Sequence, residues 1–278
     1  MRSPLVSVVV STRNEEQSIQ KCLESITNQS YPSKSIEIIV VDNFSTDRTV
    51  SIAKKYTSSI YLKGNERSTQ RNYGIREKAK GKYALFLDAD MRLSKHVIRS
   101  CVEKLEQKNE ITSLYILEEI VGNSLWSKVR NFERSFFTAT PIDAVRFFRR
   151  KDFIAIGGFD EKLRAFEDWD LTKRLKLLGQ FSLVKEPLFH DETLFSFQTY
   201  IRKKISYDKD YSLYVTKWGR NDADIKKQLG LFYRSIGVFI ENGKWKKIVS
   251  SPYYFLGICI LRSILFLCIV ESRLWRKL

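Results

Sequence analysis

The stretch YALFLDAD, residues 83–90, decides the fold, because a mostly apolar run leads directly into two aspartates. A short apolar run with polar flanks is typical of a buried strand. Two earlier stretches follow the same pattern, LVSVVVST (5–12) and IEIIVVDN (36–43), and each also ends in polar residues. The sequence therefore predicts three buried strands, each of which carries charged or polar side chains to its carboxyl end.

Helical patterns separate these runs, over residues 16–29, 47–56, 68–79 and 95–108. Strands that alternate with helices predict an α/β fold, a doubly wound and mostly parallel sheet with helices on both faces. In such sheets the ligand lies beyond the carboxyl ends of the strands. We therefore expect one crevice to receive the polar side chains that follow the three strands: Asn14, Glu15, Asp42, Asn43, Asp88 and Asp90.

The charge of the chain is concentrated at its C-terminal end. The net charge is +16, and residues 200–278 alone carry 16 Lys and Arg against 6 Asp and Glu. This surplus favours an anionic surface or ligand for that part of the chain. We predict a catalytic domain over residues 1–195 and a basic, aromatic, helical region over 196–278. The four cysteines lack the spacing of a zinc site, and they fit a reducing setting.

Two apolar segments lie within the C-terminal region, residues 229–240 and 252–270. The second is close to the roughly 20 residues that cross a bilayer, although Arg262 interrupts it. The first is shorter and resembles an interfacial helix. The second segment could span the membrane, dip into it, lie in its interface, or pack on the catalytic domain or in a dimer.

The acidic pair Asp88 and Asp90 is a candidate metal site. Two carboxylates in one loop can turn toward one point, and Mg²⁺ or Mn²⁺ takes oxygen ligands and bridges to phosphates. On its own the pair is weak, because Asp often ends strands and starts turns. His190, at the end of the apolar run 181–190, is a candidate for a further ligand.

A second acidic group is FEDWD, residues 166–170, which follows the Gly157-Gly158 turn. Acidic residues favour a helix start, and Asp170 can pair with Arg174 one turn later. These structural roles explain Asp170 but leave Glu167 and Asp168 unexplained. A carboxylate at a helix start near the crevice could take a proton from an attacking hydroxyl group.

Taken in order, these motifs resemble the inverting family-2 glycosyltransferases of the GT-A fold. VSVVVSTRNEE resembles their first strand and turn, and IIVVDNFSTDRTV resembles their VDDGSTDxT element, with Phe44 in the place of Gly. RSTQRNYGIREKAKGKYALFLDAD resembles their Arg-Asn helix and DxD strand, while GGFDE and EDWDLTKRL resemble the acceptor turn and base-bearing helix. The C-terminal region resembles membrane-bound members, such as cellulose synthases and polyprenyl-phosphate sugar transferases.

The resemblance implies a role for each matching position. Asp168 would be the catalytic base with Glu167 beside it, and Asp90 would hold the metal with Asp88 and His190. The acceptor side would include Gly157, Gly158 and Trp169. Nucleotide and donor sugar would meet Thr12, Asn14, Glu15, Asp42, Arg71 and Asp88, with Asn72 nearby. Arg202 and Lys203 are candidates for gripping a diphosphate or a lipid phosphate, or they face solvent or lipid headgroups.

We therefore expect an inverting, Mg²⁺- or Mn²⁺-dependent glycosyltransferase that uses GDP-mannose or a UDP-sugar. The expected acceptor is lipid-linked, and the catalytic domain is expected at the cytoplasmic face of the cell membrane. One alternative is a soluble enzyme whose C-terminal helix binds another protein. A nucleic-acid-binding tail would suit the basic charge, but the uncharged stretches favour lipid, so we expect no nucleic-acid partner.

Overall fold

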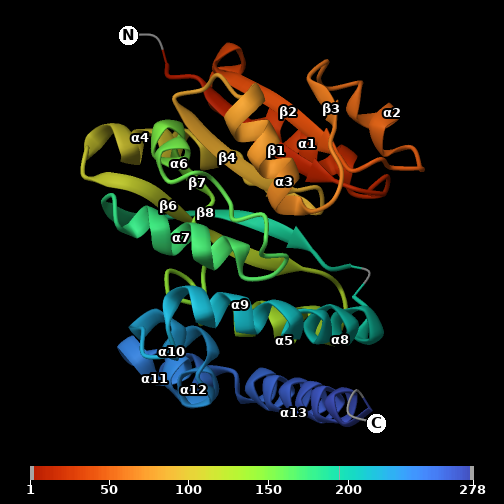
Figure 1. The fold of residues 1–278 in the computed structure, drawn as a ribbon, viewed down its shortest axis with the longest axis vertical. Coiled ribbons are helices and arrows are strands. Elements are labelled where there is room, and N and C mark those ends of the chain that lie inside the picture. Colours follow the sequence, from red (N-terminus) through yellow and green to blue (C-terminus); the bar gives the residue numbers. More distant parts are fainter. Residues whose placement is uncertain (1–2, 194, 276–278) are drawn as a thin grey trace. The chain divides into compact units, whose positions relative to one another are not determined.

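The computed structural model describes residues 3–193 and 195–275 (Figure 1). They form two compact units. The first unit holds the chain up to Glu118 together with Asp143–Asp191, and the second holds Glu119–Ile142 together with the chain from Glu192 onward. The predicted division after residue 195 stays a prediction.

An eight-stranded sheet forms the centre of the first unit, in the order β3-β2-β1-β4-β7-β6-β8-β5. Strands β1 to β4 are mutually parallel, β7 pairs antiparallel with β4 and β6, and β5 pairs antiparallel with β8. The strands are β1 Val6–Thr12, β2 Ile36–Asp42, β3 Ile60–Leu62, β4 Tyr83–Asp88, β5 Met91–Leu93, β6 Ile111–Val121, β7 Phe147–Arg149 and β8 Gln180–Asp191.

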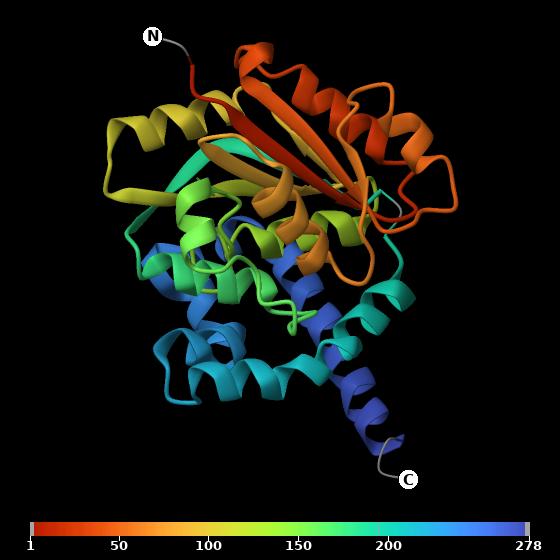
Figure 2. The ribbon, with the colours of Figure 1, turned by 45° about the horizontal axis from the view of Figure 1, so that its top comes forward.

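Helices cover both faces of this sheet. Their bounds are α1 Ile19–Thr27, α2 Thr49–Ala53, α3 Arg67–Asn72, α4 Val97–Gln107, α6 Arg150–Ala155 and α7 Glu167–Lys176, with a π-helix over Tyr73–Lys78 and a 3-10 turn over Ser33–Ser35. Helices α1, α2 and α4 share one apolar core with alternate residues of the strands. The π-helix, α6 and α7 share the core on the opposite face. Figure 2 shows α3 and α6 in front of the strands.

The period of two in a strand explains why both cores can form. Val8 and Val10 of β1 pack into the core of α1 and α4, whereas Val9 between them packs into the opposite core. Apolar side chains must therefore stand on both faces, which is why the parallel strands appear as continuous apolar runs in the sequence. The predicted α/β class and GT-A architecture are confirmed, and β7, which is antiparallel to its neighbours β4 and β6, continues the sheet beyond the parallel strands.

The register of the parallel strands brings their polar ends to one edge. Thr12 of β1 pairs with Asp42 of β2, and Ser11 of β1 pairs with Asp88 of β4. The three strands that the sequence predicts, β1, β2 and β4, therefore end at the same level of the sheet. This edge is the position at which open α/β sheets bind ligands.

The second unit is helical. Its helices are α5 Leu125–Arg134, α8 Phe197–Ser206, α9 Asp208–Trp218, α10 Ala223–Leu229, α11 Val238–Ile240, α12 Trp245–Ser250 and α13 Pro252–Trp275, with a π-helix (η3) over Tyr233–Gly237 and a 3-10 turn over Glu241–Gly243. Val129 of α5 and Ile258 of α13 lie in its small core. A Cβ atom at Gly257 would stand 2.6 Å from the Val129 side chain, so a glycine there lets α13 approach α5 closely.

Helix α13 is long and apolar enough over Pro252–Val270 to cross a membrane, judged by length and composition. Only 11% of that stretch is buried within the protein. Tyr253, Leu256, Phe266 and Leu267 are among its exposed side chains. One such helix is weak evidence of membrane insertion, yet its exposed apolar surface differs from the buried core helix of a water-soluble protein.

Candidate active site

The loops after β1 and β2 hold each other in place at the carboxyl edge. The Asn14 side-chain oxygen accepts a hydrogen bond from the Thr46 backbone at 2.9 Å. Asp42 is fully buried and accepts from the backbone of Ser45 at 2.7 Å. Phe44, which lies between Asp42 and Ser45 in the chain, has a left-handed backbone (φ 51°) and is 61% exposed. Residues with a Cβ atom that are held in this strained backbone conformation cluster at functional sites.

Arg71 of α3 lies at the centre of an ion cluster beneath this edge. Its side chain is completely buried, and its guanidinium group lies over the ring of Phe86, 4.5 Å from the centroid. Nη2 donates to Asp88 at 2.7 Å, and Nη1 donates to Asp168 at 2.8 Å and reaches Glu167 at 3.5 Å. One arginine thus joins the end of β4 to the start of α7, two acidic segments that the sequence separates by about 80 residues.

The cluster sets the ionisation of its members. Burial alone would raise the pKa of Asp88, but Arg71, Arg67 and Arg146 hold it well below its usual value. Burial, with the charge of Asp168 added, raises the pKa of Glu167 to about 7. Asp88 is therefore held as a carboxylate, while Glu167 can carry a proton near neutral pH.

Helix α7 starts directly at the cluster. Phe166, just before it, has a left-handed backbone (φ 67°), and the acidic first turn follows. Asp168 keeps 26% of its side chain exposed, whereas Glu167 keeps 5%. Asp170 is buried and pairs with Arg174 at 2.6 Å, which confirms the structural role expected for it. Of the three acids, Asp168 is the one with access to a substrate.

A second chain of charges begins at Asp90, two residues after Asp88. His190, near the end of β8, places Nε2 3.2 Å from Asp90 and Nδ1 3.2 Å from Glu118 of β6. Arg146 reaches the other oxygen of Glu118 at 3.2 Å. Burial alone would lower the pKa of His190, but the hydrogen bonds to Asp90 and Glu118 raise it to about 10.

These residues fit a divalent metal ion in part. Asp90 Oδ1 is buried and lacks a hydrogen-bond partner among the described atoms, so it is available as an oxygen ligand. A carboxylate behind a histidine is the usual support for a metal-binding imidazole, and Glu118 takes that place behind His190. Within residues 3–193 and 195–275, no group of three or more His, Cys, Asp or Glu side chains is arranged around one metal position. Water and phosphate oxygens would complete the shell.

The turn before α7 is tied to the Arg71 helix. Gly157 and Gly158 both have left-handed backbones (φ 81° and 76°). Asn72 accepts from the Phe159 backbone at 2.8 Å and donates to its carbonyl at 2.9 Å. A Cβ atom at Gly158 would lie 2.4 Å from Asn72 Oδ1, so the contact requires glycine there. Trp169, predicted on the same side, packs its ring 5.3 Å from Phe166.

Two further predicted donor residues lie at the same edge. The Thr12 hydroxyl is buried without a hydrogen-bond partner among the described atoms. Burial raises the pKa of Glu15, which follows β1, and the charges of Asp90 and Asp88, at the end of the neighbouring strand β4, add to this rise. Arg202 and Lys203 lie exposed on α8 in the second unit.

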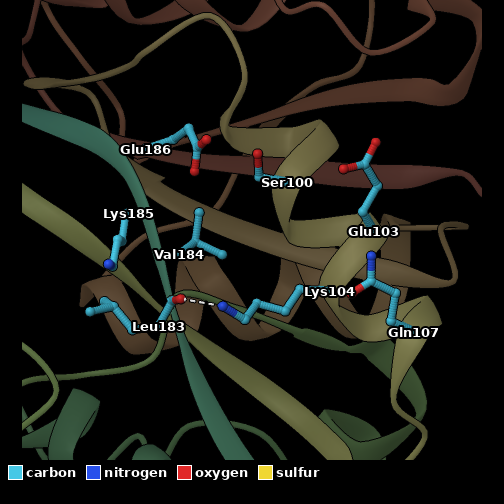
Figure 3. Close-up of a pocket in the computed structure, with 8 residues that line it drawn as sticks. All are labelled: Ser100, Glu103, Lys104, Gln107, Leu183, Val184, Lys185 and Glu186. Carbon is cyan, nitrogen blue, oxygen red and sulfur yellow. Dashed lines mark hydrogen bonds between the residues drawn. The ribbon is translucent and has the colours of Figure 1, made fainter.

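The hollow in Figure 3 is not the predicted site. It lies between α4 and residues 183–186 of β8, where Lys104 Nζ donates to the Leu183 carbonyl at 2.7 Å. None of the residues predicted to bind donor, metal or acceptor lines it. The chemistry-bearing groups gather at the carboxyl edge instead.

The sequence interpretation missed Glu118 and Arg146, which position His190. Glu118 is 8% exposed in a strand whose other residues are mostly apolar. An acidic residue inside an apolar strand was the available signal, because buried carboxylates need a partner. Arg67, also missed, reaches Glu167 at 3.5 Å and Asp88 at 3.9 Å.

Known proteins resemble the chain along most of its length. A curated relative, "Poly(ribitol-phosphate) beta-N-acetylglucosaminyltransferase TarS" of Staphylococcus aureus, is 29% identical over 204 residues, 67% of this chain. The chain spans about a third (35%) of the length of TarS. "Beta-monoglucosyldiacylglycerol synthase" of a Nostoc species is 26% identical over 63% of this chain and 42% of its own.

The fold also occurs among solved structures. The mannosyltransferase PcManGT from Pyrobaculum calidifontis, solved with GDP-Man and Mn²⁺, superposes with a TM-score of 0.64. The superposition covers 100% of this chain and 89% of that chain at 18% identity, so it bears on the fold alone. The model of the family described as "Glycosyl transferase family 2" matches residues 7–163, which include β1 to β4, Arg71, Asp88 and Asp90. The chain belongs to glycosyl transferase family 2.

Proposed function

We propose that this protein is an inverting glycosyltransferase that moves a sugar from a nucleotide-diphosphate donor to a lipid-linked acceptor. The observation that carries the proposal is the ion cluster around Arg71, which joins Asp88 and Asp168. The donor lies over the carboxyl edge, along Thr12, Asn14, Glu15, Asp42 and Asp88. Family membership supports sugar transfer as the reaction class.

Asp168 acts as the base. Its carboxylate stands at the start of α7 with a quarter of its side chain exposed, so an acceptor hydroxyl can reach it. Removal of that proton lets the hydroxyl oxygen attack the anomeric carbon opposite the leaving diphosphate, which inverts the configuration. Arg71 holds the orientation of the carboxylate, and Glu167 beside it binds a proton near neutral pH. Gly157, Gly158 and Trp169 border the acceptor.

Asp90 and His190 would hold Mg²⁺ or Mn²⁺, with Asp88 nearby and Glu118 supporting the imidazole. When bound, the ion stabilises negative charge on the departing diphosphate. PcManGT, which shares the fold, is described with Mn²⁺ and GDP-Man. The imidazole must lose a proton to ligate the ion, whereas its hydrogen bonds to Asp90 and Glu118 stabilise the protonated form, so the ion would have to displace that proton.

The acceptor is lipid-linked and the catalytic unit faces the cytoplasm. The exposed apolar surface of α13 and the basic charge of residues 200–278 support a site at a membrane. The name of the Nostoc relative, a synthase of a glucosyl-diacylglycerol, supports a lipid acceptor. TarS, whose name gives a poly(ribitol-phosphate) acceptor, supports a phosphate-bearing one. The donor is GDP-mannose or a UDP-sugar.

Calorimetry with GDP- and UDP-sugars, each with and without Mn²⁺, tests the proposal. One nucleotide sugar should bind, and Mn²⁺ should strengthen the binding. A lipid extract supplied as acceptor should then yield a glycosylated lipid in which the new linkage has the opposite anomeric configuration. Absence of binding for every nucleotide sugar would contradict the proposal.

A further inference from the structure

A cluster of cations in the second unit takes no part in the chemistry described above. It comprises Arg130 of α5, Lys204 of α8, Arg234 of the π-helix η3 and Arg262 of α13. All four side chains are partly buried, and they come together from four separate elements. Arg130 stands over the ring of Tyr200, 4.6 Å from its centroid, and Lys204 lies 5.6 Å from the same centroid.

The carboxylates at this cluster neutralise only half of it. Glu192 pairs with Arg130 at 2.9 Å, and Glu133 pairs with Arg262 at 2.7 Å. Arg262 also donates to the Arg234 backbone carbonyl. Two carboxylates thus face four cations, if only the side chains that the structure describes are counted.

Lys204 and Arg234 supply the unbalanced charge. Arg234 donates to the Gln228 carbonyl at 3.0 Å, and Lys204 contacts the rings of Tyr200 and Tyr207. Loss of water, together with the charges of Arg234 and Arg130, lowers the pKa of Lys204 to about 7. Burial and the charge of Arg262 lower the pKa of Arg234 as well. Like charges held together away from water are costly unless an anion joins them.

The surface beside the cluster is apolar. Arg262 interrupts the apolar stretch of α13, where a charged residue marks a functional position by default. The nearby side chains Ile260 and Phe266 are 44% and 63% exposed. An anion with a hydrocarbon tail would satisfy both surfaces, because its head would meet the cations and its tail would cover α13.

We propose that Arg130, Lys204, Arg234 and Arg262 bind the phosphate group of a lipid, with the acyl or prenyl chain against α13. A phosphate monoester or diphosphate has several charged oxygens, which suit the donors of arginine and lysine. The proposal needs no sugar transfer, so it can fail while the proposed glycosyltransferase function stands.

Vesicle binding by the full chain tests the proposal. The first vesicles combine phosphatidylcholine with phosphatidic acid, and the second replace phosphatidic acid with oleate at equal surface charge. We expect at least tenfold tighter binding to the phosphatidic acid vesicles. Lys204→Gln and Arg234→Gln should each remove most of that preference, while Lys204→Arg should retain it. Unfolding transitions like that of the natural chain establish that the variants fold.

The matched control is Lys246→Gln, which removes one exposed cation from α12 of the same unit. We expect less than a twofold change for this variant. Equal losses for Lys246→Gln and Lys204→Gln would mean diffuse attraction to an anionic surface and would overturn the proposal, as would equal binding to the oleate vesicles.

Inorganic pyrophosphate in solution separates a lipid from a free anion. We expect it to compete weakly with phosphatidic acid vesicles, because it lacks the chain that covers α13. Binding of pyrophosphate as tight as that of the vesicles, and sensitive to Lys204→Gln, would overturn the lipid part of the proposal.

Discussion

Arg71 Nη1 lies 2.8 Å from Asp168 Oδ1, so the carboxylate proposed as catalytic base is held by a completely buried arginine. The same guanidinium group holds Asp88 at 2.7 Å. In the proposed reaction Asp88 lies on the side of the donor sugar and Asp168 on the side of the acceptor. Arg71 is therefore the one cation that contacts both sides. Displacement of either carboxylate would move the other through Arg71, so Arg71 fixes the positions of Asp88 and Asp168 relative to one another.

Asp168→Asn should separate binding from chemistry. The amide keeps the shape of the carboxylate but cannot take a proton, so we expect a 10²- to 10⁴-fold loss of transfer rate, about the size of general-base catalysis. Donor affinity by calorimetry should change less than about threefold. Asp152→Asn, on α6 and outside both the Arg71 cluster and the acceptor turn, is the matched control. Unchanged turnover in Asp168→Asn would remove it from the role of base.

Arg71→Gln should destabilise the fold. Its loss leaves Asp88 and Glu167 partly buried without their main cation, and removal of one partner from a buried ion pair costs about 3–5 kcal/mol. The control is Arg164→Gln, because Arg164 pairs with Glu66 at 3.2 Å with 72% of its side chain exposed. That surface pair should contribute only about 0–1 kcal/mol. Denaturant unfolding measures both, and equal effects would contradict the buried cluster.

The sequence alone predicted most of this arrangement. Asp42 and Asp88 were placed at one edge because the parallel strands that carry them are long apolar runs with helices between them. The ion pairs of Arg71 were harder to predict, since a sequence does not show which acids a buried arginine meets. Residues 111–150 lack a regular period, so Glu118, Arg146 and the antiparallel pairing of β7 escaped notice. Residues 119–142 belong to the second unit although the segments on either side of them belong to the first, and no change in composition marks these two boundaries.

Neighbouring glycines offer a matched pair for the acceptor turn. Gly157→Ala meets no atom within 4 Å and should cost only the strain of a left-handed backbone, about 1–2 kcal/mol. Gly158→Ala carries the same strain and also places its Cβ 2.4 Å from Asn72 Oδ1. Loss of that hydrogen bond should add about 1–3 kcal/mol. Thermal unfolding compares the two, and equal losses would show that the Asn72 contact is unimportant.

Glu167 should give the stability of the fold a pH dependence. Its pKa is raised from 4.5 to about 7 in the folded chain, so the folded state binds this proton more tightly than the unfolded state does. Its contribution is therefore present below pH 4.5 and is lost as the pH rises through about 7. The whole contribution is at most about 3 kcal/mol.

Glu167→Gln should abolish that slope, because glutamine does not titrate. The free energy of unfolding of both chains, measured from about pH 4 to about pH 8, gives the comparison. Glu103→Gln, an exposed carboxylate on α4, is the control and should leave the slope unchanged. A slope that persists in Glu167→Gln would assign the effect to other carboxylates.

Asp90→Asn should weaken the effect of Mn²⁺ on donor binding, because a neutral amide is a poorer ligand than a carboxylate. In calorimetry we expect Mn²⁺ to strengthen donor binding to the natural chain at least tenfold and to Asp90→Asn less than threefold. Glu118→Gln should lower the affinity for Mn²⁺ by about 10- to 100-fold, the usual cost of losing the group behind a metal-binding histidine. An undiminished Mn²⁺ effect in both variants would place the metal elsewhere.

Anomalous diffraction from a crystal grown with Mn²⁺ and a nucleoside diphosphate tests the central claim most directly. The account predicts a manganese peak in contact with Asp90, with the diphosphate bound at the carboxyl edge of β1 and β4. A peak away from residues 88–90, or a diphosphate bound at a different face of the sheet, would contradict it.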